Sequence, residues 1–211
     1  MSDGGTIRHR ATGCEQEPLY TTLRTPGRTK GTIPGDPNLK NLARKIWGFD
    51  RALFRAVFRL KWPLLTIVLR AFTVAGTAGA LWGFVAAAAY LVTGLRPSHL
   101  LVPWISVAFS WTLAEGAKYL FNRARPFIDD TEVAPLIKTP SSSSFPSGHS
   151  ATAAAGALSL SAVYPAYAPA FVLAGFLVAL SRVYLGVHYP FDVLAGVLIG
   201  TATAVMILAV A

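Results

Sequence analysis

The stretch that decides the fold is residues 191–211, FDVLAGVLIGTATAVMILAVA. After Asp192 it carries no charge, and it has the roughly 20 apolar residues that a helix needs to cross a bilayer core about 30 Å thick. Four other stretches share this character, although the third is short: residues 75–95, 99–121, 150–164 and 168–186. We therefore expect an all-α integral membrane bundle of about five transmembrane helices, or six if the apolar segment 62–77 also spans.

Charge is scarce and unevenly placed along the 211 residues. Hydrophobic residues make up 53% and charged residues only 14%, where a soluble domain carries about 25%. Residues 1–61 hold 12 basic and 5 acidic residues, so +7 of the formal net charge of +9 lies there. A basic end that leads into apolar runs favours anionic lipid headgroups as its partner rather than nucleic acid. The single cysteine, Cys14, excludes an internal disulfide.

The residues that precede the expected bundle fall into two parts. Residues 1–40 are rich in Gly, Thr, Pro and Arg and lack the apolar core of a signal peptide, so we expect an uncleaved, disordered basic tail. Residues 41–60 place apolar and basic side chains at helical spacing, which predicts an amphipathic helix on a membrane surface. The apolar segment 62–77 contains Pro63 and Arg70. We interpret 41–77 as interfacial or re-entrant helices ahead of a transmembrane core at 78–211.

The first cluster of ionisable residues lies at the end of the second expected span. If a helix continues to Pro126, one of its faces carries four polar residues: Glu115, Lys118, Asn122 and Arg125. Two cations, Lys118 and Arg125, would then project from one helix end toward one region. The alternative is that both side chains only reach for lipid headgroups.

The second cluster lies where the third span begins. Ser147 is a natural N-cap, Gly148 permits close approach of the backbone, and the first amides of the helix form a ready anion site. His149, held beside a bound anion, could supply a proton. The alternative is ordinary capping by Ser147 with a histidine at headgroup level.

The third cluster joins the last two spans. Arg182 adds a third cation, and His188 and Asp192 are four residues apart, so a helical turn would bring the carboxylate to one imidazole nitrogen. The other nitrogen would remain free to attack. The alternative is that Asp192 caps the last helix and Arg182 anchors to headgroups. Short connections make neighbouring spans antiparallel, so all three clusters should share one membrane face, where they suit phosphoryl transfer through a phosphohistidine.

The three clusters together resemble the signature of the type 2 phosphatidic acid phosphatase (PAP2) superfamily of membrane lipid phosphatases. That signature is a Lys, six residues and Arg-Pro, then Pro-Ser-Gly-His, then Ser-Arg, five residues, His, three residues and Asp. Its first part corresponds here to Lys118, Arg125 and Pro126, and its second to Pro146, Ser147, Gly148 and His149. Its third part corresponds to Ser181, Arg182, His188 and Asp192.

The resemblance implies a phosphatase that uses neither a metal nor another cofactor. His188 would be the nucleophile that takes the phosphoryl group, Asp192 would orient it, and His149 would protonate the leaving oxygen. The phosphate oxygens would be held by a larger set: Lys118, Arg125, Ser147, Gly148 and Arg182. Vanadium haloperoxidases and soluble acid phosphatases share such a site, but five apolar spans fit them poorly.

One departure from the family concerns the side of the membrane on which the site works. Members often have six spans, and here the basic tail replaces the first, which puts tail and site on the same side. Seven basic residues from Lys40 to Lys61 indicate the cytoplasmic side of the plasma membrane. A cytoplasmic site suits a lipid phosphate such as decaprenylphosphoryl-ribose 5-phosphate, a polyprenyl-linked sugar phosphate. The alternatives are an outer-face phosphatase of polyprenyl diphosphate, phosphatidylglycerophosphate or phosphatidic acid, and a non-catalytic lipid-binding module.

Overall fold

The computed structural model describes residues 37–93 and 96–211, and every regular element in these ranges is a helix, which confirms the all-α fold. The chain divides into two compact units, Met1–Lys40 and Asn41–Ala211, and the bundle and its site belong to the second. Most of the predicted tail at 1–40 lies outside the described residues. The long helices are α1 (Pro37–Phe58), α2 (Pro63–Ala75), α3 (Ala80–Thr93), α4 (Ser98–Ala117), α6 (Gly148–Val163), α7 (Ala168–Tyr184) and α8 (Pro190–Val210). Three short helices complete the set: η1 (Thr77–Gly79), α5 (Pro126–Asp129) and η2 (Pro165–Tyr167).

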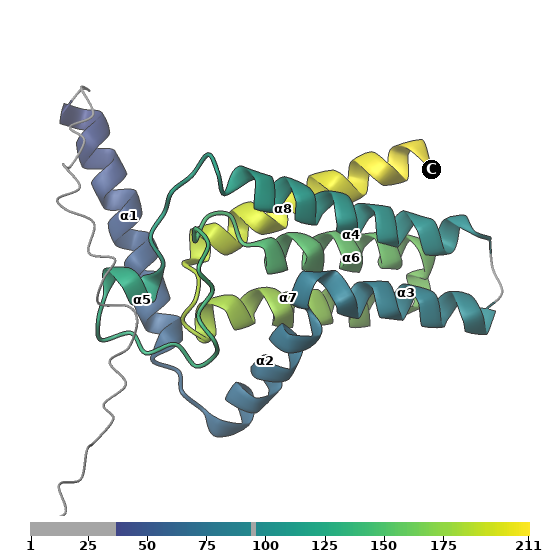
Figure 1. Ribbon diagram of the computed structural model, residues 1–211, viewed down its shortest axis with the longest axis horizontal. Coiled ribbons are helices and arrows are strands. Elements are labelled where there is room, and N and C mark those ends of the chain that lie inside the picture. Colours follow the sequence, from purple (N-terminus) through teal and green to yellow (C-terminus); the bar gives the residue numbers. More distant parts are fainter. Residues whose placement is uncertain (1–36, 94–95) are drawn as a thin grey trace, which may run out of the picture. The chain divides into compact units, whose positions relative to one another are not determined.

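Helix α6 lies at the centre of the bundle and contacts α4, α7 and α8 (Figure 1). It consists largely of small residues, which let neighbouring helices approach closely. The side chain of Trp82 in α3 packs directly against Gly156, and Gly200 of α8 lies against the backbone of Ala151. A side chain at either glycine would push the helices apart. The small residues of α6 therefore set the spacing of the helices whose ends carry the ionisable clusters.

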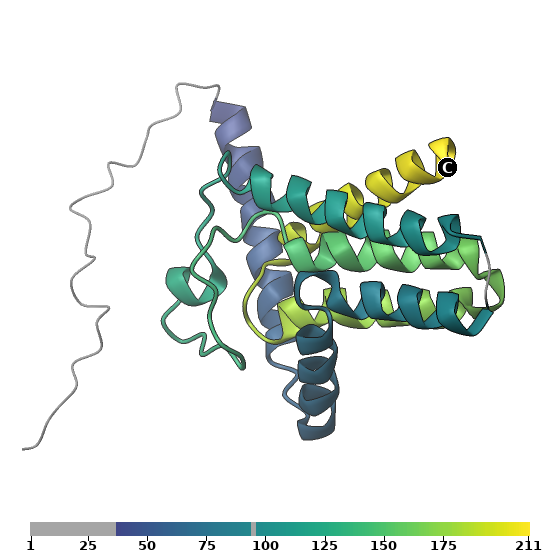
Figure 2. The ribbon, with the colours of Figure 1, turned by 45° about the vertical axis from the view of Figure 1, so that its right-hand side comes forward.

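The ends of α6 and α8 that carry these clusters are joined directly. Gly196 of α8 faces the carbonyl of Ser147, and the backbone N–H of Ser147 donates to the carbonyl of Asp192 at 3.0 Å. Between α6 and α7 the chain turns through η2, so these helices are antiparallel, as predicted. The C-terminal ends of α4 and α7 and the N-terminal ends of α6 and α8 therefore share one end of the bundle (Figure 2).

The expected spans are helical, but not all have spanning length. In the described ranges, α4, α7 together with η2, and α8 have the length and hydropathy to cross a membrane. Helices α2 and α3 reach the same standard only as a pair bent by 53°. The predicted span 75–95 therefore begins later, as the helix α3 from Ala80, because Ala78 and Gly79 adopt positive φ angles that interrupt the helix before it. Helix α6, predicted at 150–164, has 16 residues. The described part of this membrane protein therefore has three helices of spanning length, or four spans if the bent pair counts as one, where five were expected.

Helix α1 is amphipathic, as predicted, and protein covers only the part of its apolar side around Phe54 and Phe58, whereas Leu42, Ile46, Phe49 and Leu53 are exposed. Its buried residues Phe54 and Phe58 pack against Val133, Val183 and Tyr189. Two exposed ion pairs reinforce this contact, one between Arg51 and Asp129 at 3.0 Å and one between Arg55 and Asp130 at 3.1 Å. From Asn41 onward, α1 lies across the end of the bundle where α8 begins (Figures 1 and 2). Its position on a membrane surface remains a prediction.

Candidate active site

The first predicted cluster is brought to the site, but not on one helix. The prediction that a helix continues to Pro126 is wrong, because α4 ends at Ala117 and the chain then turns through i to i+3 hydrogen bonds. Lys118 lies at the C-cap, where its ammonium donates to the carboxylate of Glu115 at 2.5 Å and reaches Ser142 Oγ at 3.4 Å. Asn122 follows in the loop and lines a recess beside Lys118.

Arg125 reaches the site from the loop that follows α4. Its Nε donates to the carbonyl of Ser142 and its Nη1 to the carbonyl of Val187, both at 2.8 Å. Nη1 also lies 3.2 Å from Nε2 of His188. Burial lowers the pKa of the Arg125 guanidinium to about 10, with Asp192 and Glu115 acting in the opposite direction. Arg125 therefore remains a cation at neutral pH, held against the predicted nucleophile.

The N-terminus of α6 has the predicted form. Ser147 is the N-cap, its Oγ accepts from the backbone N–H of Ser150 at 3.4 Å, and Ser150 Oγ lies 2.9 Å away. Gly148 faces Glu115 and the ammonium of Lys118, so a side chain there would meet both. His149 points into a recess that it shares with Arg182. Helix amides, a histidine and two cations thus converge at this helix end.

Arg182 is buried with a donor to spare. Its side chain is 3% exposed, and its Nη1 donates to Oγ1 of Thr73 in α2. Within the described part of the chain, the buried Nε atom of Arg182 has no hydrogen-bond partner. A buried polar group normally finds a partner. An anionic ligand in the recess would supply one.

His188 is held in one tautomer, although not in the way predicted. Its Nδ1 lies 2.7 Å from the carbonyl of Ser144, which can only accept, so Nδ1 carries the proton and Nε2 keeps its lone pair. The predicted approach of Asp192 is present, since its carboxylate lies 3.6 Å from Nδ1, but the hydrogen bond that fixes the tautomer goes to the Ser144 carbonyl instead. Burial, and then the charges of Arg125, Arg182 and Lys118, hold the pKa of His188 well below its ordinary value, so the ring is neutral.

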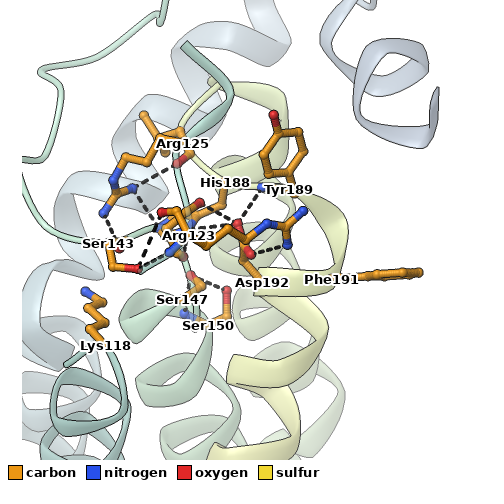
Figure 3. Close-up of polar contacts among 12 residues, drawn as sticks. Lys118, Arg123, Arg125, Ser143, Ser147, Ser150, His188, Tyr189, Phe191 and Asp192 are labelled. Atoms are coloured by element: carbon orange, nitrogen blue, oxygen red, sulfur yellow. Dashed lines mark hydrogen bonds and ion pairs between the residues drawn. The ribbon is translucent and has the colours of Figure 1, made fainter. Parts of the chain in front are cut away.

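Asp192 acts on His188 through an intermediary that sequence reasoning missed. Its Oδ2 accepts from Ser144 Oγ at 2.5 Å, and the carbonyl of the same serine binds His188. Oδ2 also accepts the backbone N–H of Tyr189 at 2.8 Å, and Oδ1 accepts from Arg123 at 2.5 Å (Figure 3). Neither Ser144, in a run of serines, nor Arg123, in a loop with several charges, stands out in the sequence.

Two recesses open beside these residues. One, of about 590 Å³, is lined by His149 and Arg182 together with hydroxyl-bearing, apolar and cationic residues: Thr73, Val74, Thr77, Ile137, Lys138, Thr139, Pro140 and Ser141. The other, of about 320 Å³, is lined by Glu115, Lys118, Tyr119, Asn122, Ser142 and Ser143. Each contains a predicted phosphate ligand, and the first contains the predicted proton donor.

Fold and site define a class of protein: a helical membrane protein in which a buried neutral histidine faces cations and a helix N-terminus. The chain belongs to the PAP2 superfamily, whose family model matches residues 67–211. This confirms the resemblance read from the three clusters.

Similar proteins carry names of lipid phosphatases. The chain is 38% identical over 115 residues to the lipid A 1-phosphatase of Rhizobium johnstonii, covering 50% of this chain and 47% of that protein. It is 39% identical over 97 residues to the decaprenylphosphoryl-5-phosphoribose phosphatase of Mycolicibacterium smegmatis, covering 44% and 52%. The chain spans about half the length of the curated relatives it matches. The crystal structure of Aquifex aeolicus LpxE superposes with a TM-score of 0.65 at 28% identity, covering 75% of this chain and 93% of that one.

Proposed function

We propose that this protein is a membrane lipid phosphatase that hydrolyses a phosphate ester through a phosphohistidine on His188. The observation that carries the proposal is the pair of contacts on the His188 ring. The Ser144 carbonyl holds the proton on Nδ1, and Nε2 faces the Arg125 guanidinium at 3.2 Å. The imidazole is buried and neutral, and its Nε2 lone pair accepts from the Nη1–H of Arg125; a phosphate that binds Arg125 would take over this donor and leave the lone pair facing phosphorus.

In the first step, Nε2 of His188 attacks phosphorus and the bond to the leaving oxygen breaks. Burial and the nearby cations Arg182 and Lys118 lower the pKa of His149 to about 3 in the free site, so His149 would gain its proton when the bound phosphate dianion neutralises those cations. It then gives that proton to the leaving oxygen, and the lipid product leaves as an alcohol. Arg125 and Arg182 stabilise the charge that gathers on the equatorial oxygens, and the buried Nε of Arg182 can donate to one of them. The amides at Gly148 and His149 add donors at the α6 terminus.

In the second step, water attacks phosphorus and the P–N bond breaks. His149, now neutral, accepts a proton from that water, and inorganic phosphate leaves. The His188 ring returns to its neutral form with the proton still on Nδ1. Every proton taken in the first step is therefore restored in the second.

The proposal includes hydrolysis without a metal ion. Positive charge at the site comes from Lys118, Arg125 and Arg182, which can do electrostatically what a metal does in other phosphatases. We expect phosphate release to continue in EDTA. Loss of activity in EDTA that magnesium restores would contradict this part of the proposal.

As substrate we propose a polyprenyl-linked sugar phosphate, with decaprenylphosphoryl-ribose 5-phosphate as the best candidate. The recess beside His149 supports this, because its lining includes the hydroxyl-bearing residues Thr77, Thr139 and Ser141. Its volume of about 590 Å³ exceeds what a phosphate alone would fill. Hydroxyl-bearing walls suit a hydroxylated headgroup better than a bare diphosphate. The Mycolicibacterium smegmatis relative is named for this substrate.

We propose further that the protein lies in the inner membrane, with its site on the cytoplasmic side. Contacts of α1 with α8 and with the 129–133 loop support a common side for the basic segment and the site. Helix α2 also remains near that end, since the Trp62 N–H donates to Tyr184 Oη at 3.0 Å and Thr73 binds Arg182. Seven basic residues from Lys40 to Lys61 then favour the cytoplasmic side. The same cations suit anionic headgroups.

Sidedness can be tested with single cysteines in a Cys14→Ser background. Thr131→Cys lies in the loop at the site end, and Arg96→Cys lies between α3 and α4 at the other end. We expect an impermeant thiol reagent to label whole cells at residue 96 and to leave residue 131 unlabelled. The reverse pattern would return the outer-face lipids to first place.

The substrate is tested by the release of phosphate from a panel of lipid phosphates in detergent, with His188→Ala as the blank. We expect the polyprenyl sugar phosphate to be hydrolysed fastest. Faster hydrolysis of polyprenyl diphosphate, phosphatidylglycerophosphate or phosphatidic acid would favour those alternatives. If folded protein released phosphate from no lipid, the non-catalytic lipid-binding module would be the better description.

A further inference from the structure

A buried carboxylate of α1 lies on the Asp192 side of His188. Asp50 has 0% exposure, although it is the only acidic residue in the basic segment from Lys40 to Lys61. It also lies outside residues 67–211, which the family model matches. A buried carboxylate is costly unless charged and hydrogen-bonded partners satisfy it. The partners of Asp50 therefore indicate its role.

Both oxygens of Asp50 bind groups of the site region. Oδ2 accepts from Arg123 Nη2 at 2.5 Å, and Oδ1 accepts the backbone N–H of Phe191 at 2.9 Å. Phe191 is the second residue of α8, so Asp50 satisfies an amide in the first turn of the helix that carries Asp192. Helix α1 thus fixes the start of α8.

Arg123 connects Asp50 to Asp192. Its Nη1 donates to Asp192 Oδ1 at 2.5 Å, while Nη2 donates to Asp50. The guanidinium also lies between the rings of Trp47 and Tyr189, with Cζ 4.4 Å and 4.3 Å from their centroids. Figure 3 shows Arg123 beside Asp192 and Tyr189. Two rings and two carboxylates together leave this planar cation little freedom.

The constraint continues from Asp192 to the nucleophile. Ser144 donates its hydroxyl to Asp192, and its carbonyl accepts the Nδ1–H of His188. A shift of Asp192 would therefore move the group that sets the tautomer and direction of the ring.

We infer that Asp50 and Arg123 are positioning residues, which hold Asp192 and, through Ser144, keep the His188 ring in the orientation for attack. The inference rests on the proposed function of His188. Charge contributes as well as shape, because one cation between two carboxylates leaves one negative charge behind the ring. That charge favours the positive charge which the ring acquires when Nε2 bonds to phosphorus.

Asp50→Asn separates the two roles of this residue. Asparagine keeps an oxygen that can accept from Phe191 but loses the charge that faces Arg123. We expect kcat to fall about ten- to a hundredfold, with KM changed less than about threefold. Phosphohistidine formation in a single turnover should slow by the same factor. Asp50→Ala, which loses both roles, should lower kcat at least as much as Asp50→Asn; wild-type kcat in Asp50→Asn would overturn the inference.

Asp130→Asn is the matched control. It removes the exposed ion pair between Arg55 and Asp130, which also links α1 to the loop but does not touch Asp192. We expect wild-type kcat for this variant. An equal loss of kcat in Asp130→Asn and Asp50→Asn would mean that any contact that holds α1 on the bundle affects kcat. That result would overturn the inference.

Arg123→Lys keeps the inference testable if the Asp50 variants do not fold. Lysine keeps the charge but cannot bridge two carboxylates with a fixed fork. We expect a similar fall in kcat with an unchanged inhibition constant for inorganic phosphate, and wild-type kcat would overturn the inference. Failure of the proposed function is distinguishable, because the wild-type protein itself would then form no phosphohistidine on His188.

Discussion

Two charged groups face His188 from opposite sides, and their pairing differs. Two of the front cations, Arg125 and Arg182, bind neutral partners in the described part of the chain, and the Nε of Arg182 binds none. The third, Lys118, pairs with Glu115. In the rear chain, formed by Asp50, Arg123 and Asp192, each charge meets an opposite charge at 2.5 Å. Arg125 and Arg182 can therefore receive negative charge from a ligand, whereas the charges of the rear chain pair with one another and leave one negative charge over. Substitutions of the front cations should therefore weaken phosphate binding, whereas substitutions in the rear chain should lower kcat with little change in KM.

The largest expected effect lies between the two groups, at His188 itself. His188→Ala should lower kcat by at least about 10⁴-fold, because no other group in the site has its lone pair held for attack. Phosphate release and trapping of the phosphoenzyme measure this. His99→Gln, at the opposite end of α4, should retain activity. If the phosphoenzyme persists in His188→Ala but disappears in His149→Ala, His149 would be the nucleophile and His188 the proton donor.

The next largest effect is expected at the front cations. Arg182→Met removes a donor that only a ligand would satisfy, and kcat/KM should fall about 10²- to 10³-fold. Inhibition by inorganic phosphate should weaken as well, which distinguishes this variant from those of the rear chain. Arg55→Met, at an exposed arginine of α1, provides the control. Unchanged inhibition by phosphate would remove Arg182 from the anion site.

A smaller effect is expected where the rear chain reaches the nucleophile. Ser144→Ala keeps the carbonyl that binds His188 but loses the hydroxyl that donates to Asp192, so kcat should fall about tenfold. KM should change little. Ser161→Ala is a suitable control, since its hydroxyl donates only to the Ala157 carbonyl of its own helix. A larger change in KM than in kcat would show that Ser144 contacts the substrate.

The smallest effect concerns pH. His188 faces Arg125, Arg182, Lys118 and His149 as well as Asp192, and its pKa lies well below 6.5. The attacking form therefore persists as pH falls, and the acid limb of kcat/KM should lie below pH 6.5 once substrate ionisation is corrected. The free energy of unfolding should also fall as the pH falls, because the histidine binds a proton near pH 6.5 in the unfolded chain but not in the folded one. The contribution of His188 to stability is therefore fully present above about pH 6.5 and is lost as the pH falls below that value. Arg182→Met should move the acid limb upward; an unmoved limb would assign it to another group.

The front of the site could be predicted from the sequence because its residues fall in local patterns. A serine and glycine before an apolar run predict a helix N-terminus, and antiparallel helices bring its neighbours together. Even there, the path of the chain could not be read. The spacing from Lys118 to Arg125 suits a helix, yet the chain leaves α4 at Ala117 and a loop delivers Arg125.

The rear chain escaped sequence reasoning because its pairs are distant along the chain. Asp50 and Arg123 are 73 residues apart, and Arg123 and Asp192 are 69 apart. No periodicity records such contacts. The one local sign was a single carboxylate in a basic amphipathic helix, which a surface position explains equally well. The link from Asp192 to His188 through Ser144 was missed for a related reason. The i to i+4 spacing suggested that Asp192 itself fixes the tautomer of His188, but the carbonyl of Ser144 does so.

The pairing of Asp50 with Phe191 also bears on biosynthesis. Residue 50 leaves the ribosome long before residue 191, and at about 5–20 residues per second the interval is on the order of 10–30 s. Throughout that time Asp50 lacks the amide that it caps in the finished fold, and Arg123 lacks Asp192. Helix α1 can therefore complete its contacts with α8 only after the last helix has been made, whereas its partners Val133 and Val183 are available earlier. The connected contacts of Asp50, Arg123 and Asp192 are therefore among the last of the fold that can form.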